Sequence, residues 1–489
     1  MNLLYRFTLR VGVLLCVLGF SGCVQRTQSP LWEKTELQQA LRDVRKTAGS
    51  DIPNTLTRAD KTALSAPVNS TPPPVDAVNG LSEILRMAAE RSPMVEAARR
   101  RWTGSTYKRA QVVSLPDPKL EYKYYVRQMA REEEKWELGI SQEIPYPGKL
   151  IIGGKLADKE SEIAYLRYQI AVRNSIAEAK EIYCEIYYID RAQKVTAEIE
   201  KLYARYSALA SGGTEVAKPK LPEKFRAESQ QAQLGYDLIL LREMRMAELA
   251  RLRAAVGSRP DWQPAATTEL AEPPESISTL ESLQDQAERF NQELSAAGLE
   301  VERAEFQTKL ARRAPIPDLM VGASYMRTGD MGSGPDPTRD PITVGVGVSV
   351  PLWFGKYKAM LSEAKEMEKA AHAEKDAQAL QLRANLARAF FSLNNSLRLV
   401  RLYRDNLIPQ SRQALQSAEE LYRKGNANLA SVLETTATVH NFELARLRAL
   451  TDFYQNVARI ERVIGTAIEL RPPQAAPLTI PATQQEVTR

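Results

Sequence analysis

Residues 148–155 imitate a phosphate-binding loop, with three glycines ahead of Lys155. In a working loop the lysine directly follows the last of the spaced glycines, and a Ser or Thr after it binds magnesium. Here the lysine comes one place late, and Leu156 stands where the hydroxyl is needed. The segment also follows a stretch with the alternation of a membrane strand. We therefore do not expect nucleotide binding.

The other residue types that carry chemistry are sparse or poorly placed. The two histidines, His372 and His440, lie far apart in the sequence, which disfavours a zinc or copper site. The loop over residues 327–340 contains Gly and Asp but lacks the terminal glutamate of a calcium loop. No nucleophile and base stand out as a set. We therefore expect no enzyme, no metal site and no cofactor.

The composition excludes further classes of protein. Charged residues make up 26% and hydrophobic residues 44% of the 489 positions, which fits neither a disordered chain nor a bundle of membrane-spanning helices. The formal net charge of +6 comes from 66 basic and 60 acidic residues, and no basic cluster accompanies it. Nucleic acid is therefore not an expected partner.

Cys23 is the residue with the clearest expected chemistry. Residues 1–22 have a positive start and a short apolar run, as in a secretory signal, and residues 20–23 resemble a bacterial lipobox. We expect a signal peptidase to cleave before Cys23 and the Cys23 thiol to take a lipid such as palmitate; the alternative is ordinary cleavage nearby, with Cys23 as a bystander. Val24 is not the aspartate of inner-membrane lipoproteins, which favours the outer membrane. Cys184 is then the single free thiol, and we expect it to pack inside a helix bundle.

Four segments alternate apolar and polar or very small residues, the pattern of strands with one apolar face. Strands of about ten residues with this period fit a transmembrane β-barrel, and the alternative is a soluble sheet packed on helices. Four strands cannot close a barrel, so a membrane sheet of this kind requires several chains. Three chains would supply twelve strands, although the spacing alone does not fix the number three. The segments are residues 120–126, 136–144, 319–325 and 342–350.

The rest of the chain repeats one plan of helix, two strands and two long helices. Pro116-Asp117 recurs as Pro317-Asp318, and Gly148-Lys149 recurs as Gly355-Lys356, in the same order. Apolar residues in the long segments are spaced by three and four, which predicts coiled-coil packing. A helix of about 60 residues would be about 90 Å long. The helices are expected at residues 81–113, 149–210, 222–256, 280–313, 356–425 and 428–464, with a kink or break at Pro409.

These features divide the chain into six parts. After the signal, a polar segment with one short helix near residues 31–46 is expected to act as a tether. The two repeats follow, joined by a linker and ended by a tail. The boundaries are 1–22 for the signal, 23–80 for the tether, 81–257 for the first repeat, 258–279 for the linker, 280–466 for the second repeat and 467–489 for the tail.

The duplicated plan, the Pro-Asp strand starts and the strand exits followed by Gly-Lys resemble the TolC-type outer membrane efflux family over residues 80–466. The resemblance implies a mainly α-helical fold with a small membrane β part, and a homotrimer with a 12-stranded barrel and an α-helical periplasmic tunnel. It also implies a periplasmic adaptor and an inner-membrane pump as partners, and outer membrane lipid around the barrel. Many members are lipoproteins, which agrees with Cys23.

The resemblance also implies functional positions at the periplasmic tip. Gly425, Leu429 and Val432 correspond to the adaptor-binding turn, and Glu434 corresponds to an acidic gate position. Ala427 and Ser431 depart from the family, which makes the gate less acidic and removes one latch.

In the first repeat, Gly213 is the corresponding tip glycine and Arg226 corresponds to Glu434, so Arg226 is a candidate counter-charge at the gate. The first-repeat turn has extra residues and two prolines, Pro219 and Pro222, which weakens the expectation of an adaptor site there.

Two further readings follow from the same residues. Pro116-Asp117-Pro118 and residues 145–149, with their Pro-x-Pro-Gly-Lys pattern, are similar to the family's metal-exporting branch and suggest heavy-metal efflux. The competing class is a lipid-anchored periplasmic coiled-coil scaffold without a pore. Such a scaffold would share the long helices but would not need two hairpins with lipid-type alternation.

Overall fold

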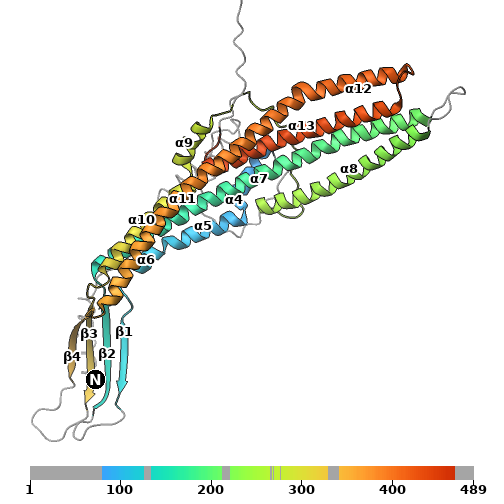
Figure 1. Ribbon diagram of the computed structural model, residues 1–489. Helices are drawn as coiled ribbons and strands as arrows, with labels where there is room; N and C mark the ends of the chain where they lie inside the picture. The colour runs from blue at the N-terminus through green and yellow to red at the C-terminus, as the bar shows by residue number, and fades with distance from the viewer. Residues whose placement is uncertain are drawn as a thin grey trace, which may run out of the picture. The chain divides into compact units, whose positions relative to one another are not determined.

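The computed structural model describes residues 80–125, 134–211, 221–264, 267, 269–275, 277–328 and 341–468. All of them belong to one compact unit, Thr55–Arg489. Long helices run side by side, and four strands continue from one end of them (Figure 1). The expected short helix at residues 31–46 lies outside the described residues.

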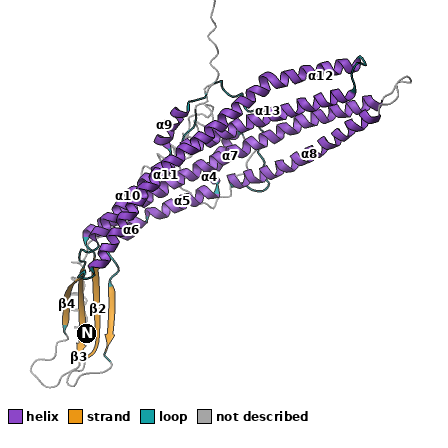
Figure 2. Cartoon of the chain, viewed as in Figure 1, coloured by secondary structure: helices purple, strands orange, loops and turns teal. Residues whose placement is uncertain are grey.

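The first half of the described chain contains two helical arms joined to a β-hairpin (Figure 2). Short helices precede the hairpin in the chain, and two long helices follow it. The elements are α4 (Leu81–Arg91), α5 (Pro93–Thr106), α6 (Lys108–Val113), β1 (Lys119–Tyr124), β2 (Glu134–Ile144), α7 (Pro147–Ser211) and α8 (Leu221–Val256).

The second half repeats this order of elements, as the duplicated plan predicts. Its first long helix is interrupted by a segment of π-helix, η1. The elements are α9 (Leu280–Phe290), α10 (Gln292–Arg313), β3 (Leu319–Thr328), β4 (Ile342–Val348), α11 (Phe354–Arg401), η1 (Leu402–Leu407), α12 (Ile408–Arg423) and α13 (Leu429–Ile464).

The prediction of one unbroken helix at the start of each repeat was wrong. In the first repeat the helix breaks at Ser92, whose ψ is 127°, because the following Pro93 disfavours helical geometry in the residue before it. In the second repeat it breaks at Asn291, whose side-chain oxygen accepts from the Leu294 N–H at 2.7 Å and caps α10. A further break at Tyr107 separates α5 from α6.

The expected disturbance at Pro409 is confirmed. Proline has no N–H, so the carbonyl four residues before it loses its helical partner. The chain accommodates this loss with η1, a wider turn that ends directly before α12. No described helix has the length and apolar content needed to cross a membrane.

Each repeat buries its first short helix against its own pair of long helices. α4 packs against α7 and α8, and α9 packs against α11 and α13. A glycine follows the last long helix of each repeat and packs against the end of the short helix. Gly257 and Gly465 have φ of +62° and +98°, and a Cβ would collide with the Arg91 carbonyl oxygen at Gly257 and with the Phe290 carbonyl oxygen at Gly465. The core residues in the first repeat are Ile84, Leu85, Met87, Ile182, Ile186, Leu249 and Leu252; in the second they are Leu283, Leu386, Leu393, Leu397, Phe453, Ile460 and Ile464.

The four strands form one antiparallel sheet in the order β1-β2-β3-β4. Pairing between β2 and β3 joins the two repeats within the chain, from Ile144 opposite Leu319 to Trp136 opposite Arg327. An irregularity between Glu134 and Trp136 ends this register. β1 and β4 are therefore the two edges of the sheet.

Candidate functional site

The sheet gathers the apolar residues of all four strands on one face. Residues directly opposite each other in an antiparallel sheet point to the same side. Val346 of β4 lies opposite Val321 of β3, which in turn lies opposite Gln142 of β2. Every second residue of each strand therefore points to the same side of the sheet. This face carries Leu120, Tyr122, Tyr124, Trp136, Leu138, Ile140, Ile144, Leu319, Val321, Ala323, Tyr325, Ile342, Val344, Val346 and Val348.

The apolar face has no cover within the described chain. Val344 and Val346 are 77% and 70% exposed, as are most of the large apolar side chains beside them. Trp136 contacts Tyr122 and Tyr325, with ring centroids 6.2 and 5.6 Å apart, so three aromatic rings lie together near the end of the sheet remote from the helices. An apolar surface with an aromatic band at one rim is the pattern of a strand layer in lipid.

The opposite face of the sheet carries mostly polar or very small residues, as the alternation predicts. Gly345 lies opposite Gly322, and Gly347 lies opposite Met320. Ionic groups also occur on this face, where the Lys123 ammonium lies 3.4 Å from the Glu121 carboxylate. A Cβ built on Gly345 would meet no atom within 4 Å, so this face has room for larger side chains.

An ion pair connects the two repeats where the sheet meets the helices. The Lys149 ammonium, at the start of α7, donates to both carboxylate oxygens of Asp318 at 2.9 and 2.8 Å and to the Ile316 carbonyl at 2.7 Å. The Tyr146 backbone N–H donates to the same carboxylate at 2.7 Å. Partial burial alone would raise the pKa of Asp318, but these hydrogen bonds and the lysine charge hold it below its usual range.

The glycines of the false phosphate loop have a packing role. Gly153 and Gly154 lie in α7 against Val112 and Val113 of α6. A Cβ on either glycine would stand 2.6 or 2.9 Å from a valine methyl group, closer than packed carbon atoms approach. The absence of side chains there allows the two helices to touch. The loop-like spacing is therefore explained by helix contact.

The far end of the helices contains the second-repeat turn. Gly425 has a φ of +77°, and its N–H donates to the Tyr422 carbonyl at 3.0 Å, which ends α12. The Asn428 side chain accepts from the Ser431 N–H at 3.0 Å and caps α13. Gly425, which the sequence analysis places at the tip, thus shapes this turn together with the Asn428 cap. Gly213, the first-repeat counterpart, lies outside the described residues.

Leu429 and Val432 are fully buried at this end. They pack in a cluster, the tip cluster, that joins the helices of both repeats. Tyr203 donates from its hydroxyl to the Leu433 carbonyl at 2.8 Å, and Tyr206 donates to Glu419 at 2.7 Å. Sequence analysis missed the two tyrosines, because their partners lie more than 200 residues away. The cluster members are Tyr203, Tyr206, Ala210, Ala227, Leu234, Ala418, Leu429, Val432 and Leu433.

Glu434 and Arg226 are exposed, on α13 and α8 respectively. Glu434 follows the buried pair of Val432 and Leu433, so its side chain leaves the tip cluster toward the outside. Among the described residues, no ion pair joins Glu434 and Arg226. The gate role of both residues stays a prediction.

Two residues with potential chemistry are buried in the bundle. The His440 ring nitrogen Nε2 lies 3.2 Å from the Thr196 hydroxyl, and burial lowers the pKa of this histidine. Cys184 is buried, as expected, and burial raises the pKa of its thiol to about 12. Neither side chain is therefore charged or reactive at neutral pH. Cys23, the expected lipidation site, lies outside the described residues.

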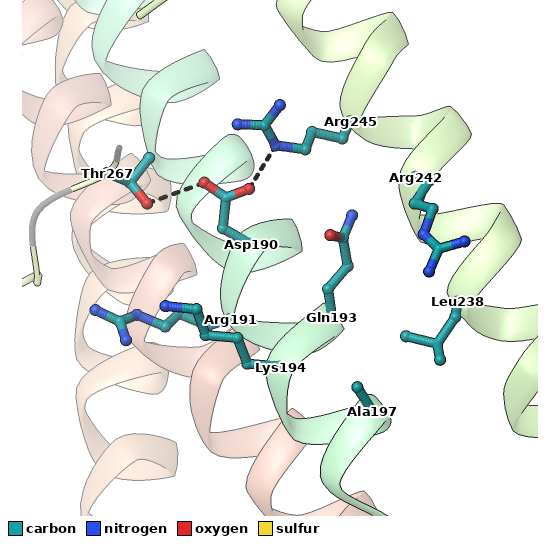
Figure 3. Close-up of a pocket in the computed structure, with 9 residues that line it drawn as sticks. All are labelled: Asp190, Arg191, Gln193, Lys194, Ala197, Leu238, Arg242, Arg245 and Thr267. Atoms are coloured by element: carbon teal, nitrogen blue, oxygen red, sulfur yellow. Dashed lines mark hydrogen bonds and ion pairs between the residues drawn. The ribbon is translucent and has the colours of Figure 1, made fainter. Parts of the chain in front are cut away.

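A pocket of about 370 Å³ lies between α7 and α8 (Figure 3). Asp190 accepts from Arg245 Nε of α8 at 2.6 Å and from the Thr267 hydroxyl at 3.1 Å, so residue 267 is bound to α7 through the same carboxylate that joins the two helices. Sequence analysis did not find this site, because its contacts join distant segments. Basic groups outnumber acidic ones around it, which favours anions over cations. The pocket is lined by Asp190, Arg191, Gln193, Lys194, Ala197, Leu238, Arg242, Arg245 and Thr267.

Comparisons with known proteins agree with this geometry. The family described as outer membrane efflux protein matches residues 283–466. The cobalt-zinc-cadmium resistance protein CzcC of Cupriavidus metallidurans is 23% identical over 172 residues, which are 35% of this chain and 40% of CzcC. The chain therefore matches less than half the length of that relative.

Solved structures match over most of the chain. The outer membrane protein VceC from Vibrio cholerae has a TM-score of 0.65 at 17% identity, over 79% of this chain and 96% of VceC. The outer-membrane channel OprN has a TM-score of 0.65 at 20% identity, over 86% of this chain and 99% of OprN. Residues 283–466 therefore match the outer membrane efflux protein family, and the long helices with four antiparallel strands have the fold of these solved outer membrane proteins.

Proposed function

We propose that three copies of this chain form the outer membrane channel of a tripartite efflux system. In this role the channel takes substrates from a periplasmic adaptor and an inner-membrane pump and releases them outside the cell. The observation that carries the proposal is the four-stranded sheet, with one mostly apolar, exposed face and two open edges. An uncovered face of this kind suits lipid, whereas open edges do not.

The open edges of the sheet imply that several chains are needed to close a barrel. Each chain supplies four strands, and the smallest membrane barrels need about eight. Three chains would give a ring of about twelve, with the polar and small face turned toward the lumen. The lumen-facing glycines would leave space for passage of solutes. β1 of one chain would then pair with β4 of the next, and no edge would remain in lipid.

The long helices supply the reach that a periplasmic tunnel needs. α7 has 65 residues, which gives about 98 Å at 1.5 Å per residue. α8, α12 and α13 return or run beside it, so three copies would enclose a long helical passage. The turn at Gly425 would face the adaptor. Because Leu429 and Val432 are buried, we infer that they support the shape of the turn, and that exposed neighbours make the direct contact.

The competing function is a lipid-anchored scaffold without a pore. The purified chain should be inserted into planar bilayers and its single-channel currents recorded, with heat-denatured protein as the control. Stepwise ionic currents from the folded sample support the channel. Folded protein that binds the bilayer without currents would support the scaffold. The anchor itself is part of the proposal: lipidated Cys23 would hold the chain at the outer membrane.

For the substrate, we infer heavy-metal ions. The support is the similarity to CzcC, whose name records resistance to cobalt, zinc and cadmium, together with the Pro-x-Pro-Gly-Lys strand exit at residues 145–149. Cells that lack the chain should be grown in graded cobalt, zinc and cadmium, and in parallel in organic antibiotics. Sensitivity to the metals alone is the expected result. Sensitivity to the antibiotics alone would overturn the assignment.

A further inference from the structure

At the junction between the repeats, several hydrogen bonds hold one lysine and one aspartate. Lys149 donates to Asp318 and to the Ile316 carbonyl, and the Tyr146 N–H also donates to the Asp318 carboxylate. Both charged side chains are largely covered, with 18% of Lys149 and 23% of Asp318 exposed. This junction lies where the exit of β2 meets the start of β3, so it fixes the pairing of those strands relative to the helices.

The duplicated sequence supplies the same groups a second time. Asp117 follows Pro116 as Asp318 follows Pro317, and Lys356 follows Gly355 as Lys149 follows Gly148. The backbone at the two lysines also agrees, because the N–H of each donates to the carbonyl three residues earlier, at 2.8 Å for Lys149 and 3.0 Å for Lys356. Copy two has one extra residue, Leu352, ahead of this turn.

Asp117 and Lys356 nevertheless do not pair within one chain. Both side chains are exposed, and neither forms an ion pair with any residue in the described ranges. Asp117 stands at the β1 edge of the sheet and Lys356 follows the β4 edge. Three strand spacings separate these edges, about 14 Å, whereas an ion pair needs its charged atoms within about 4 Å.

We propose that Asp117 of one copy and Lys356 of the next form the same junction across the interface between chains. The site is incomplete in a single chain, and a second copy of this chain is its partner. Asp117 accepts from the Lys356 ammonium and from the Trp353 N–H, which is the counterpart of Tyr146. The inference rests on the proposed trimeric channel and specifies which residues join its subunits.

The strand register provides an independent check. Within the chain Ile140 pairs with Ala323, and Leu138 pairs with Tyr325. Carrying this register to the equivalent positions of the outer edges places Val346 opposite Tyr122 and Val344 opposite Tyr124 of the neighbouring copy. All four of these side chains belong to the apolar face that the sheet already has. A register that differed by one residue would have put tyrosines opposite glycines of the polar face.

Charges on the adjoining helices fit the same interface. Within the chain, α10 lies against α7, and Arg167 forms an ion pair with Glu300 at 3.1 Å. At the equivalent positions, α11 carries Glu374, and α5 carries three arginines in a row, residues 99–101. Here the acidic residue lies on the long helix and the basic residues lie on the short one, the reverse of Arg167 and Glu300. The attraction between opposite charges is therefore retained. Arg101 and Glu374 are exposed, and no described ion pair includes either.

A cross-linking experiment tests the pair directly. Asp117→Cys and Lys356→Cys are combined in one chain, folded into membranes and treated with a bismaleimide too short to span the sheet. The expected products are covalent dimers and trimers. The matched control is Asp318→Cys with Lys149→Cys, which should react within one chain and leave its apparent mass unchanged. Each single variant should give no cross-linked chains.

A charge-reversal series gives a second measurement. Asp117→Lys should increase the rate of trimer dissociation in detergent about tenfold, because three pairs are lost together. The double variant Asp117→Lys with Lys356→Asp should restore most of this loss.

Trimers that conduct ions while the cysteine pair stays uncross-linked, with the internal control reacting, would overturn the junction and leave the channel standing. Chains that neither conduct nor form trimers would instead refute the proposed function.

Discussion

Val346→Lys tests the outward face of the barrel. Val346 lies in the middle of β4, opposite Val321, and is 70% exposed in the single chain. If this face meets lipid, a lysine there costs about 2–4 kcal/mol per chain near the bilayer midplane. Three copies in one barrel bring the total to about 6–12 kcal/mol, which is comparable to the stability of a whole domain. We therefore expect little or no assembled barrel.

Gly345→Lys is the matched control for this prediction. It adds the same charge one residue away, on the face turned toward the lumen, where a Cβ meets no atom within 4 Å. We expect a change of no more than about 0.5 kcal/mol, as at other solvated positions. Gly347→Ser should be similarly mild, because its Cβ would meet the Met320 Cβ at 3.6 Å, an ordinary contact.

The assay compares the urea midpoints of wild type, Val346→Lys and Gly345→Lys folded in vesicles, with gel mobility of unheated samples as a second readout. The facing assignment predicts a large loss for Val346→Lys alone. Equal midpoints and equal assembly for the two lysine variants would refute it. A larger loss for Gly345→Lys would show that the two faces are reversed.

Three other predictions concern the lipid anchor, the gate and the ion pair between the repeats. Cys23→Ala should abolish incorporation of labelled fatty acid, whereas equal labelling of the variant would place the lipid elsewhere. Glu434→Ala should reduce cation selectivity, because three carboxylates around one axis attract cations, and Arg226→Glu should raise open-state conductance; bilayer recordings unchanged by both would remove these residues from the gate. Because the pKa of Asp318 is lowered in the folded chain, its contribution should be complete above its ordinary value of 3.8 and lost as the pH falls further. Asp318→Asn should therefore lower the urea midpoint at pH 7, and the difference from wild type should shrink as the pH falls below 3.8; a difference independent of pH would contradict this.

The strands could be predicted from sequence because their signal is local. Alternation with a period of two survives without knowledge of the partner strand, and the four expected segments agree with β1–β4 to within a few residues. The long helices were predictable for the same reason. The helix breaks at Ser92 and Asn291 were missed, although Pro93 and the capping side chain of Asn291 were available as signals.

The contacts that position the site were beyond reach of the sequence. Lys149 and Asp318 are 169 residues apart, and their pairing depends on the order of strands in the sheet. The tip cluster likewise joins Tyr203 to Leu433 through a carbonyl that no side-chain pattern marks. Sequence spacing does not distinguish such pairs from the many exposed charges along the helices. The duplication, once seen, provides the missing link, because one observed junction locates its counterpart.

Subunit stoichiometry of the conducting particle tests the central claim most directly. Chains with light and heavy isotope labels are mixed before folding, the fraction that conducts in bilayers is isolated, and its intact mass is measured. A ring of three chains with twelve strands predicts four mass species, containing zero to three heavy chains. A conducting particle of one chain, or a folded particle of three chains that carries no current, would contradict the account.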